Sequence, residues 1–253
     1  LGAGSGALVG FTLGLVGGGG SILAVPLMVY LVGVPNPHIA IGTSALAVAA
    51  NAAANLVPHA RAGNVKWRCA SMYAAAGVAG AWIGSNIGKA FDGQKLLFLF
   101  ALLMLVVGAL MLKGRDTLGN PKVRLNRENA PRIVGFGAVT GLFSGFFGIG
   151  GGFLIVPGLI ASTGMPMLNA VGSSLVAVSA FGLTTSVNYA RSGLIDWPLA
   201  AVFIAGGIGG GVIGAMAARR LSGKKGLLNI VFAGLIFAVA AYMLWQSSAA
   251  FRA

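Results

Sequence analysis

Charge is the first property that this sequence lacks. Only 8% of the 253 residues are charged and 57% are hydrophobic, whereas a water-soluble domain carries about 25% charged residues. So few polar side chains cannot cover the outside of an apolar interior, which excludes a water-soluble fold. Cysteine is also scarce, and the single Cys69 excludes an internal disulfide framework.

Acidic residues are the scarcest charged type. The four are Asp92, Asp116, Glu128 and Asp196, and none lies inside a long apolar run. A cation pathway or a carboxylate proton relay through a membrane would require an acid within a span. The sequence also has no phosphate loop ending in Gly-Lys-Ser/Thr and no cluster of His, Cys and acids that ligates a metal. We therefore expect no enzyme activity, no metal and no cofactor.

Long apolar runs are what the sequence has instead, and they predict an all-α polytopic membrane protein. A helix needs about 20 apolar residues to cross a hydrocarbon core and satisfies its own backbone hydrogen bonds there. The runs span about 6–32, 40–58, 70–88, 95–112, 135–161, 170–190, 198–218 and 227–246. The net charge of +13 does not indicate nucleic acid, because Lys and Arg lie in the gaps between runs, as the positive-inside rule describes.

The two halves of the chain repeat one another. Gly10 to Pro26 matches Gly141 to Pro157 at an offset of 131 residues, and Gly42-Thr43-Ser44 matches Gly172-Ser173-Ser174 at 130. The same offset of 130 relates Arg61, Gly63 and Trp67 to Arg191, Gly193 and Trp197. We predict a first transmembrane repeat at 1–112, a basic linker at 113–132 and a second repeat at 133–253.

The first apolar run of each half is interrupted by glycines. Gly17 to Gly20 and Gly148 to Gly152 disfavour a continuous helix, and a proline follows the first group after six residues and the second after five. We therefore predict two half-helices joined by an extended glycine loop. Irregular backbone at membrane depth requires burial in protein or a cavity.

The charges distinguish two topologies. If the broken runs cross the membrane, the 17 Lys and Arg divide 11 to 6 between its sides. If the broken runs are re-entrant hairpins, three basic residues in 61–68, six in 113–132 and four in 219–225 share one side, which leaves four on the other. The second division fits the positive-inside rule better. We therefore predict inverted repeats, each a re-entrant hairpin plus three full transmembrane helices, with a cytoplasmic linker and a substrate near the midplane.

The glycine loops are the first candidate binding site. Backbone N–H groups without helix partners and the positive ends of half-helix dipoles both favour binding of an anion. Close helix packing is an alternative explanation for the spaced glycines. Helix capping is an alternative for the hydroxyl pairs, and helix–helix hydrogen bonding for the amide face. The predicted substrate-binding residues are Gly19, Gly20, Ser21, Thr43, Ser44, Asn51, Asn55, Gly150, Gly151, Gly152, Ser173, Ser174, Thr185 and Asn188.

Arg61 and Arg191 are predicted gating residues, because a guanidinium binds oxyanions in a bidentate way. A contact with the helix C-terminus or with lipid headgroups is the alternative. We expect His38 and His59, in or beside loops, to be structural rather than proton-carrying.

The doubled motif resembles the sulfite exporter TauE/SafE family, also called the toluene sulfonate uptake permease family. It comprises Gly14-x-x-Gly17-Gly18-Gly19-Gly20 to Pro26 and Gly145-x-x-Gly148-Ile149-Gly150-Gly151-Gly152 to Pro157, together with the Gly-Thr/Ser-Ser and Arg-x-Gly motifs. Ser21 departs from the pattern, because Gly152 is its counterpart in the second half. The resemblance implies a multi-pass protein of a bacterial inner membrane that carries sulfite, sulfonates or sulfoacetate.

We therefore expect a secondary transporter of a small sulfur-containing anion that works by alternating access. An anion channel or passive facilitator is the alternative, and a membrane-embedded enzyme or assembly subunit is a third class. The expected partners are a small inorganic or organic anion and the lipid bilayer, without nucleic acid, and a homodimer is an open option.

Overall fold

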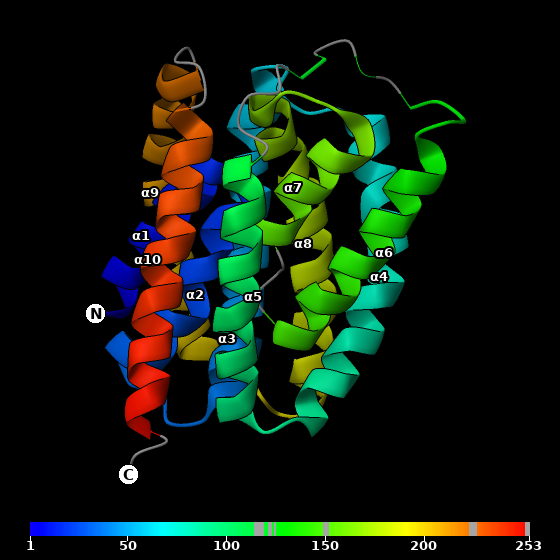
Figure 1. Ribbon diagram of the computed structural model, residues 1–253. Helices are drawn as coiled ribbons and strands as arrows, with labels where there is room; N and C mark the ends of the chain where they lie inside the picture. Colours follow the sequence, from blue (N-terminus) through cyan, green and yellow to red (C-terminus); the bar gives the residue numbers. More distant parts are fainter. Residues whose placement is uncertain (114–118, 121–122, 124, 149–151, 223–226, 251–253) are drawn as a thin grey trace.

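The structure is a computed structural model that describes residues 1–113, 119–120, 123, 125–148, 152–222 and 227–250. Every regular element within these residues is helical (Figure 1). In chain order the elements are α1 Gly2–Val16, the 3-10 helix η1 Gly17–Leu23, α2 Ala24–Pro26, the π-helix η2 Leu27–Val32, α3 Pro37–Arg61, α4 Trp67–Ala90, α5 Gly93–Lys113, α6 Ala130–Phe147, α7 Gly152–Thr163, α8 Met167–Arg191, α9 Trp197–Ser222 and α10 Leu227–Ala250.

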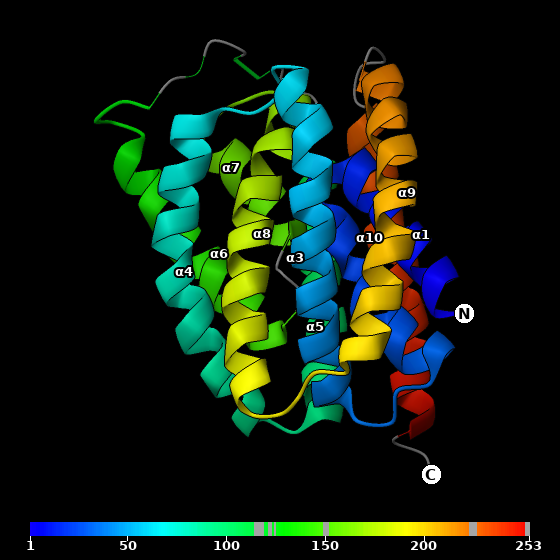
Figure 2. The same cartoon turned by 180° about the vertical axis from the view of Figure 1, so that it is seen from behind.

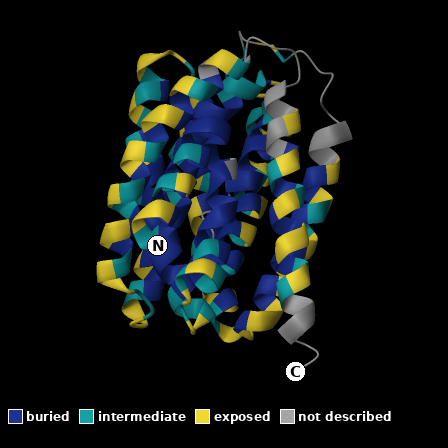
Figure 3. Ribbon diagram, turned by 90° about the vertical axis from the view of Figure 1, so that its left-hand side faces the viewer, coloured by how far each residue is buried: buried dark blue, intermediate teal, exposed yellow. Residues whose placement is uncertain are grey.

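The predicted apolar runs all correspond to helices. Among the described residues, four helices are long and apolar enough to cross a membrane: Pro37–Arg61, Ala130–Phe147, Met167–Arg191 and Trp197–Ala218. Large apolar side chains such as Val106, Leu183 and Ile213 are exposed on the outer faces of the bundle, and Figure 3 shows exposed positions facing outward around a buried interior. Such a surface suits contact with lipid tails.

The first broken run contains a 3-10 helix, so the predicted extended loop is wrong there. After α1, Gly17 adopts φ 65°, and residues Gly17–Leu23 coil tightly. Gly20 lies directly against the α1 backbone at Thr12 and Leu13, and the Thr12 hydroxyl donates to the Gly20 carbonyl at 3.2 Å. The absence of side chains permits this approach, and i→i+3 hydrogen bonds satisfy the backbone. In the second half α6 ends at Phe147, Gly148 follows with φ 66°, and 149–151 lie outside the described residues.

Each broken run returns to the end of the bundle where it began. Residues at the start of α6 and at the end of α7 line one common cavity, and Asn120 of the linker donates its N–H to the Gly164 carbonyl at 2.8 Å. At the opposite end, Gly2 of α1 and Val32 of η2 line another common cavity. Figure 1 shows that α3 and α8 run in opposite directions, as do α4 and α9.

The helices of each half pack mainly against helices of the other half. The most extensive packing joins α1 of the first half to α9 of the second, and α6 of the second half to α4 of the first. Corresponding helices also pair with each other, α3 with α8 and α5 with α10 (Figures 1 and 2). Each half therefore depends on the other for its closest contacts.

Glycine faces mediate the two closest pairings. Gly10 of α1 lies against Gly207 of α9, and its repeat counterpart Gly141 of α6 lies against Gly77 of α4. A Cβ on Gly10 or Gly141 would overlap the facing backbone. These spaced glycines therefore serve close helix packing, the alternative account that the sequence offered.

Candidate functional site

The breaks of the two hairpins touch at the centre of the molecule. Gly18 of η1 lies against Gly152 at the start of α7, so closely that a Cβ on either would overlap the other's backbone. The two glycine segments, one from each half, therefore meet. Two hairpins that enter from opposite ends and meet at their breaks place irregular backbone deep inside the protein.

The second arm of each hairpin begins at this meeting point. The α7 helix starts at Gly152 and runs outward for 12 residues, and η1 starts the corresponding arm of the first half. The N-terminus of a helix carries partial positive charge and N–H groups without intrahelical partners. The centre of the bundle therefore gathers two electropositive helix ends, one from each half.

Ser174 of α8 holds the first break in place through a hydrogen bond. Its Oγ accepts a hydrogen bond from the Gly18 N–H at 2.9 Å and donates to the Val171 carbonyl at 2.8 Å. The repeat counterpart Ser44 is buried on α3 and donates to the Ile41 carbonyl at 2.9 Å. Gly148 lies against the Ile41 side chain, so Ser44 belongs to the environment of the second break. Ser21 is buried and donates to the Gly18 carbonyl at 2.8 Å.

The other hydroxyl of each pair bonds to a loop. Thr43 accepts from the Asp196 N–H at 2.9 Å, and Ser173 accepts from the Lys66 N–H at 2.9 Å. The alternative that these pairs cap a helix is wrong, because α3 already begins at Pro37 and α8 at Met167. Thr43 and Ser173 instead anchor the loops before α9 and α4.

Four of the predicted glycines remain to be placed. Gly20 packs on α1, as described above, and Gly19 lies in η1 beside Gly18. Gly150 and Gly151 lie outside the described residues. The assignment of all four to anion binding stays a prediction.

The amide face of α3 lies between α1 and α9. Asn51 and Asn55 are 0% and 2% exposed, and their side chains lie against Gly207 and Gly211 of α9. Asn55 donates through Nδ2 to the Asn51 carbonyl at 2.9 Å. Within the described part of the chain, Asn55 Oδ1 and both amide atoms of Asn51 have no hydrogen-bond partner.

The second half does not repeat this amide face. Phe181 occupies the position that corresponds to Asn51, lies against Gly77 and stacks on Tyr73 with ring centroids 6.4 Å apart. Thr185 corresponds to Asn55, is fully buried, and its hydroxyl has no partner among the described residues. The predicted Thr185 thus lies on the matching face, but its neighbour is an aromatic ring.

Asn188 belongs to a different cluster, at the ends of α4 and α8. The Lys89 ammonium donates to Asn188 Oδ1 at 2.9 Å, to the Asn188 carbonyl at 3.3 Å and to Ser192 Oγ at 2.9 Å. Asn188 Nδ2 donates to Ser85 Oγ. These bonds join the C-terminal ends of two helices that come from different halves.

Arg61 and Arg191 end α3 and α8, as predicted, and lie at opposite ends of the bundle. The Arg191 guanidinium lies 5.1 Å from the ring centroid of Trp82, a cation–π arrangement. Both arginines are exposed. Their role in gating stays a prediction.

The two histidines contact backbone carbonyls. His38 lies in the first turn of α3, and its Nε2 is 3.1 Å from the Phe91 carbonyl. His59 is 1% exposed in the last turn of α3, and its Nε2 is 3.1 Å from the Gly14 carbonyl. His59 continues the face of Asn51 and Asn55 at a spacing of four residues, a signal that could have placed it with the amides.

Sequence reasoning missed Lys89 and Ser85. Lys89 stood out only as one of few basic residues near a span end, and nothing in the repeat indicated it.

Asp92, Glu128 and Asp196 lie outside the helices, while Asp116 lies outside the described residues. Among the described residues no group of three or more His, Cys, Asp or Glu could hold a metal.

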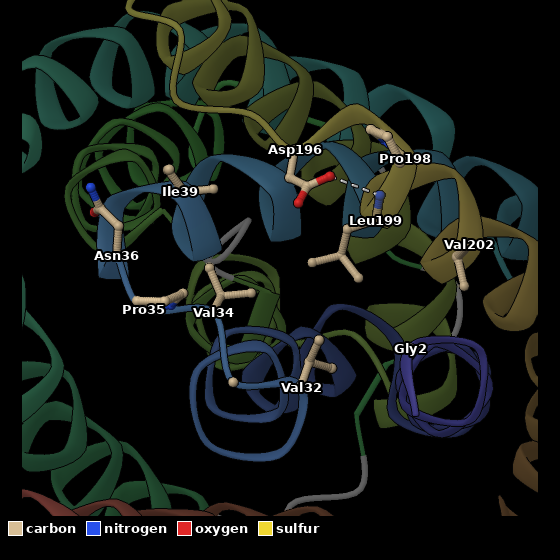
Figure 4. Close-up of a pocket in the computed structure, with 11 residues that line it drawn as sticks. Gly2, Val32, Val34, Pro35, Asn36, Ile39, Asp196, Pro198, Leu199 and Val202 are labelled. Carbon is tan, nitrogen blue, oxygen red and sulfur yellow. Dashed lines mark hydrogen bonds between the residues drawn. The ribbon is translucent and has the colours of Figure 1, made fainter.

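Two cavities open at the hairpin mouths. One, of about 710 Å³, lies between the start of α1, the loop after η2 and the start of α9. Figure 4 shows its apolar lining and the Asp196 carboxylate, which accepts from the Leu199 N–H at 3.0 Å. The other, of about 620 Å³, lies at the opposite end and includes Glu128, Arg132 and Thr163. The repeat relates the two mouths, but the second is the more polar.

Comparison with known proteins places this architecture in a family. The sequence model of the family described as "Sulfite exporter TauE/SafE" matches residues 2–243. A "Probable membrane transporter protein" of Xylella fastidiosa (strain 9a5c) is 58% identical over 96% of this chain and 94% of its own length. The "Probable membrane transporter protein YunE" of Bacillus subtilis (strain 168) is 27% identical over 86% of this chain and 88% of its own. No solved structure matches the chain.

These relatives are named as membrane transporters and not as enzymes, which agrees with the expectation from the sequence. Together with the apolar helices they identify a multi-pass membrane protein. The chain belongs to the sulfite exporter TauE/SafE family of membrane transporters.

Proposed function

We propose that this protein is a secondary transporter that carries a small sulfur-containing oxyanion of the sulfite, sulfonate or sulfoacetate type across the bacterial inner membrane. The observation that supports this most is the contact between Gly18 and Gly152. It brings together two helix N-termini from two halves of the chain. An anion bound beside this contact would lie near the starts of α7 and η1, and the described acids all lie outside the helices.

The arrangement of the halves suits alternating access. We propose that they are inverted repeats, each with a re-entrant hairpin and three spanning helices, with 113–132 as a cytoplasmic linker. The two cavities at opposite ends of the bundle, one beside the mouth of each hairpin, support this proposal. Rocking of one group of helices against the other would expose that site to each side in turn.

The remaining predicted residues line or support this site. Ser44, Ser174 and Ser21 surround the breaks, while Asn51, Asn55 and Thr185 extend the polar face along α3 and α8. We assign Thr43, Ser173 and Asn188 a supporting role, because their hydrogen bonds hold loops and helix ends. Arg61 and Arg191 would attract anions at the two mouths. A homodimer stays a prediction.

Counterflow in proteoliposomes tests the proposal. Labelled sulfite and a short sulfonate are supplied outside vesicles that contain unlabelled substrate or none. A carrier gives saturable uptake that substrate on the opposite side accelerates. Flux that neither saturates nor responds to that substrate would identify an anion channel instead. No flux for any oxyanion would remove the substrate class.

A further inference from the structure

The amides of Asn51 and Asn55 form a buried polar site that the fold leaves unsatisfied. Both side chains are at least 98% buried, from exposures of 0% and 2%. The N–H of Asn55 Nδ2 bonds to the Asn51 carbonyl, which fixes the orientation of that amide and leaves Oδ1 as an acceptor. Neither this oxygen nor either amide atom of Asn51 has a partner within the described residues. Buried amide groups without partners are costly, so a ligand that satisfies them binds favourably.

The surroundings of these amides are electrically neutral. The facing helix α1 carries no titratable side chain between Gly2 and Val16. On α9 the titratable residues are Arg219 and Arg220, which follow Gly211 by more than two helical turns, a rise of about 12 Å. On α8, which packs on α3 along the other side, the titratable residues are Tyr189 and Arg191 at the C-terminal end of the helix. On α3 itself His59 is the next residue of the same face and bonds to Gly14. A dianion would therefore face the side-chain oxygens of Asn51 and Asn55 without an adjacent cation to offset the repulsion.

We propose that Asn51 and Asn55 select a singly protonated oxyanion, of the hydrogen sulfite type, over a fully ionised one. The anion's own O–H donates to Asn55 Oδ1, and the Asn51 amide donates to one of its charged oxygens. The inference rests on the proposed function, because the pair lies on α3 between Ser44, near the second break, and the C-terminal end of the helix. It also accounts for transport without a carboxylate relay, since the proton travels on the substrate.

Proton-linked binding tests this selection. Sulfite binding to the purified protein in lipid nanodiscs is measured by calorimetry, at a pH where the dianion predominates and in buffers of different ionisation enthalpy. We expect uptake of about one proton per bound anion, because the bound form carries a proton that the free form lacks. Methanesulfonate has no proton to donate and should bind at least about tenfold more weakly.

Substitutions of Asn55 test whether the proton of the bound anion is held by its side chain. Asn55→Leu keeps the branching and the number of heavy atoms of the side chain and removes the acceptor, so it should abolish both the proton uptake and the preference for sulfite. Asn55→Thr is the second variant, because Thr185 occupies the corresponding position of the other repeat and such a residue fits the fold. Asn86→Leu makes the same change at an exposed amide that bonds within α4, and should leave binding unaltered.

The outcomes separate this inference from the proposed function. Sulfite that binds without proton uptake, or that keeps its uptake in both Asn55 variants, overturns the selection by Asn51 and Asn55 while transport stands. A His59→Gln variant that binds sulfite without proton uptake would place the proton on the protein, and also overturns it. A protein that neither binds nor moves any oxyanion contradicts the proposed function itself.

Discussion

At the scale of single residues, the backbone contact at the centre limits the size of the side chain that either position can carry. Gly152 and Gly18 approach so closely that no side chain fits between them. The N–H of Gly18 is held by Ser174 and its carbonyl by Ser21, so this part of the first break cannot easily move aside. A methyl group at this point would therefore push the two hairpins apart.

Gly152→Ala should reduce sulfite flux in proteoliposomes by at least about tenfold, because misplacing the two helix ends weakens every interaction directed at the anion. Overpacking should also destabilise the protein by about 1–3 kcal/mol, measured by thermal unfolding in detergent. Gly135→Ala on α6 is the control, because a methyl group there would meet no atom within 4 Å, and it should retain flux. Equal flux in both variants would remove the central contact from the mechanism.

The sequence indicated the two breaks better than the contacts of the residues around them. Consecutive glycines followed by a proline predicted the two breaks, because few other structures accommodate that composition. The directions of Thr43 and Ser174 were not predictable, since adjacent hydroxyls on a helix point about 100° apart and the loops that receive them lie more than 100 residues away. The 3-10 conformation of Gly17–Leu23 likewise depends on its packing against α1.

At the scale of elements, Lys89 joins the ends of α4 and α8. Its ammonium group donates to two oxygens of Asn188 on α8 and to the hydroxyl of Ser192, which directly follows α8. Hydrogen bonds from a charged donor are stronger than those between neutral groups. A transporter that opens at this end must separate these helices or move them together, so the contact affects the balance between conformations.

Lys89→Met should lower the stability of the protein by about 1–3 kcal/mol and increase the accessibility of the α8 end. Alkylation of a cysteine placed at Ala190 reports that accessibility, with Cys69 replaced by serine. Lys95→Met removes a charge at the same end of the bundle, where the side chain is exposed, and serves as control. If the cysteine at position 190 is alkylated at the same rate in the Lys89→Met and Lys95→Met variants, the contact between Lys89 and α8 has no role in opening.

The glycine faces of α1, α4, α6 and α9 are a second feature at this scale. Gly141→Ala should destabilise the protein by about 1–3 kcal/mol, because the new methyl group overlaps the Gly77 backbone. Gly209→Ala on α9 meets open space and should raise stability, since alanine favours a helix by about 1 kcal/mol over glycine. Thermal unfolding of the two variants checks the opposite signs.

The helices themselves were predictable, but their partners were not. Every apolar run became one or more helices, because composition and length alone determine which segments can cross a bilayer. Spaced glycines at Gly10 and Gly141 indicated close packing without naming the neighbour. That α1 packs on α9 rather than on its own half follows from the three-dimensional arrangement of two repeats, which one repeat cannot reveal.

At the scale of the whole molecule, the ends at which the two hairpins open make the proposed topology testable. Residues Glu128 and Ala161 line the same cavity although they flank the whole of α6 and most of α7. Pro35 lines the cavity at the other end, between the first hairpin and α9. This arrangement agrees with the charge distribution that favours a cytoplasmic linker, since 113–132 leads directly into α6.

Side-specific labelling checks this topology. In a Cys69→Ser background, single cysteines are placed at Glu128, Ala161 and Pro35 and treated with a membrane-impermeant thiol reagent in intact cells and in inverted vesicles. We expect the cysteines at 128 and 161 to react only in inverted vesicles and the cysteine at 35 only in intact cells, because the second hairpin returns to the side from which it entered. If α6 and α7 together crossed the membrane, 128 and 161 would react from opposite sides. That result would make the halves parallel and would leave the central contact without two matched routes of access.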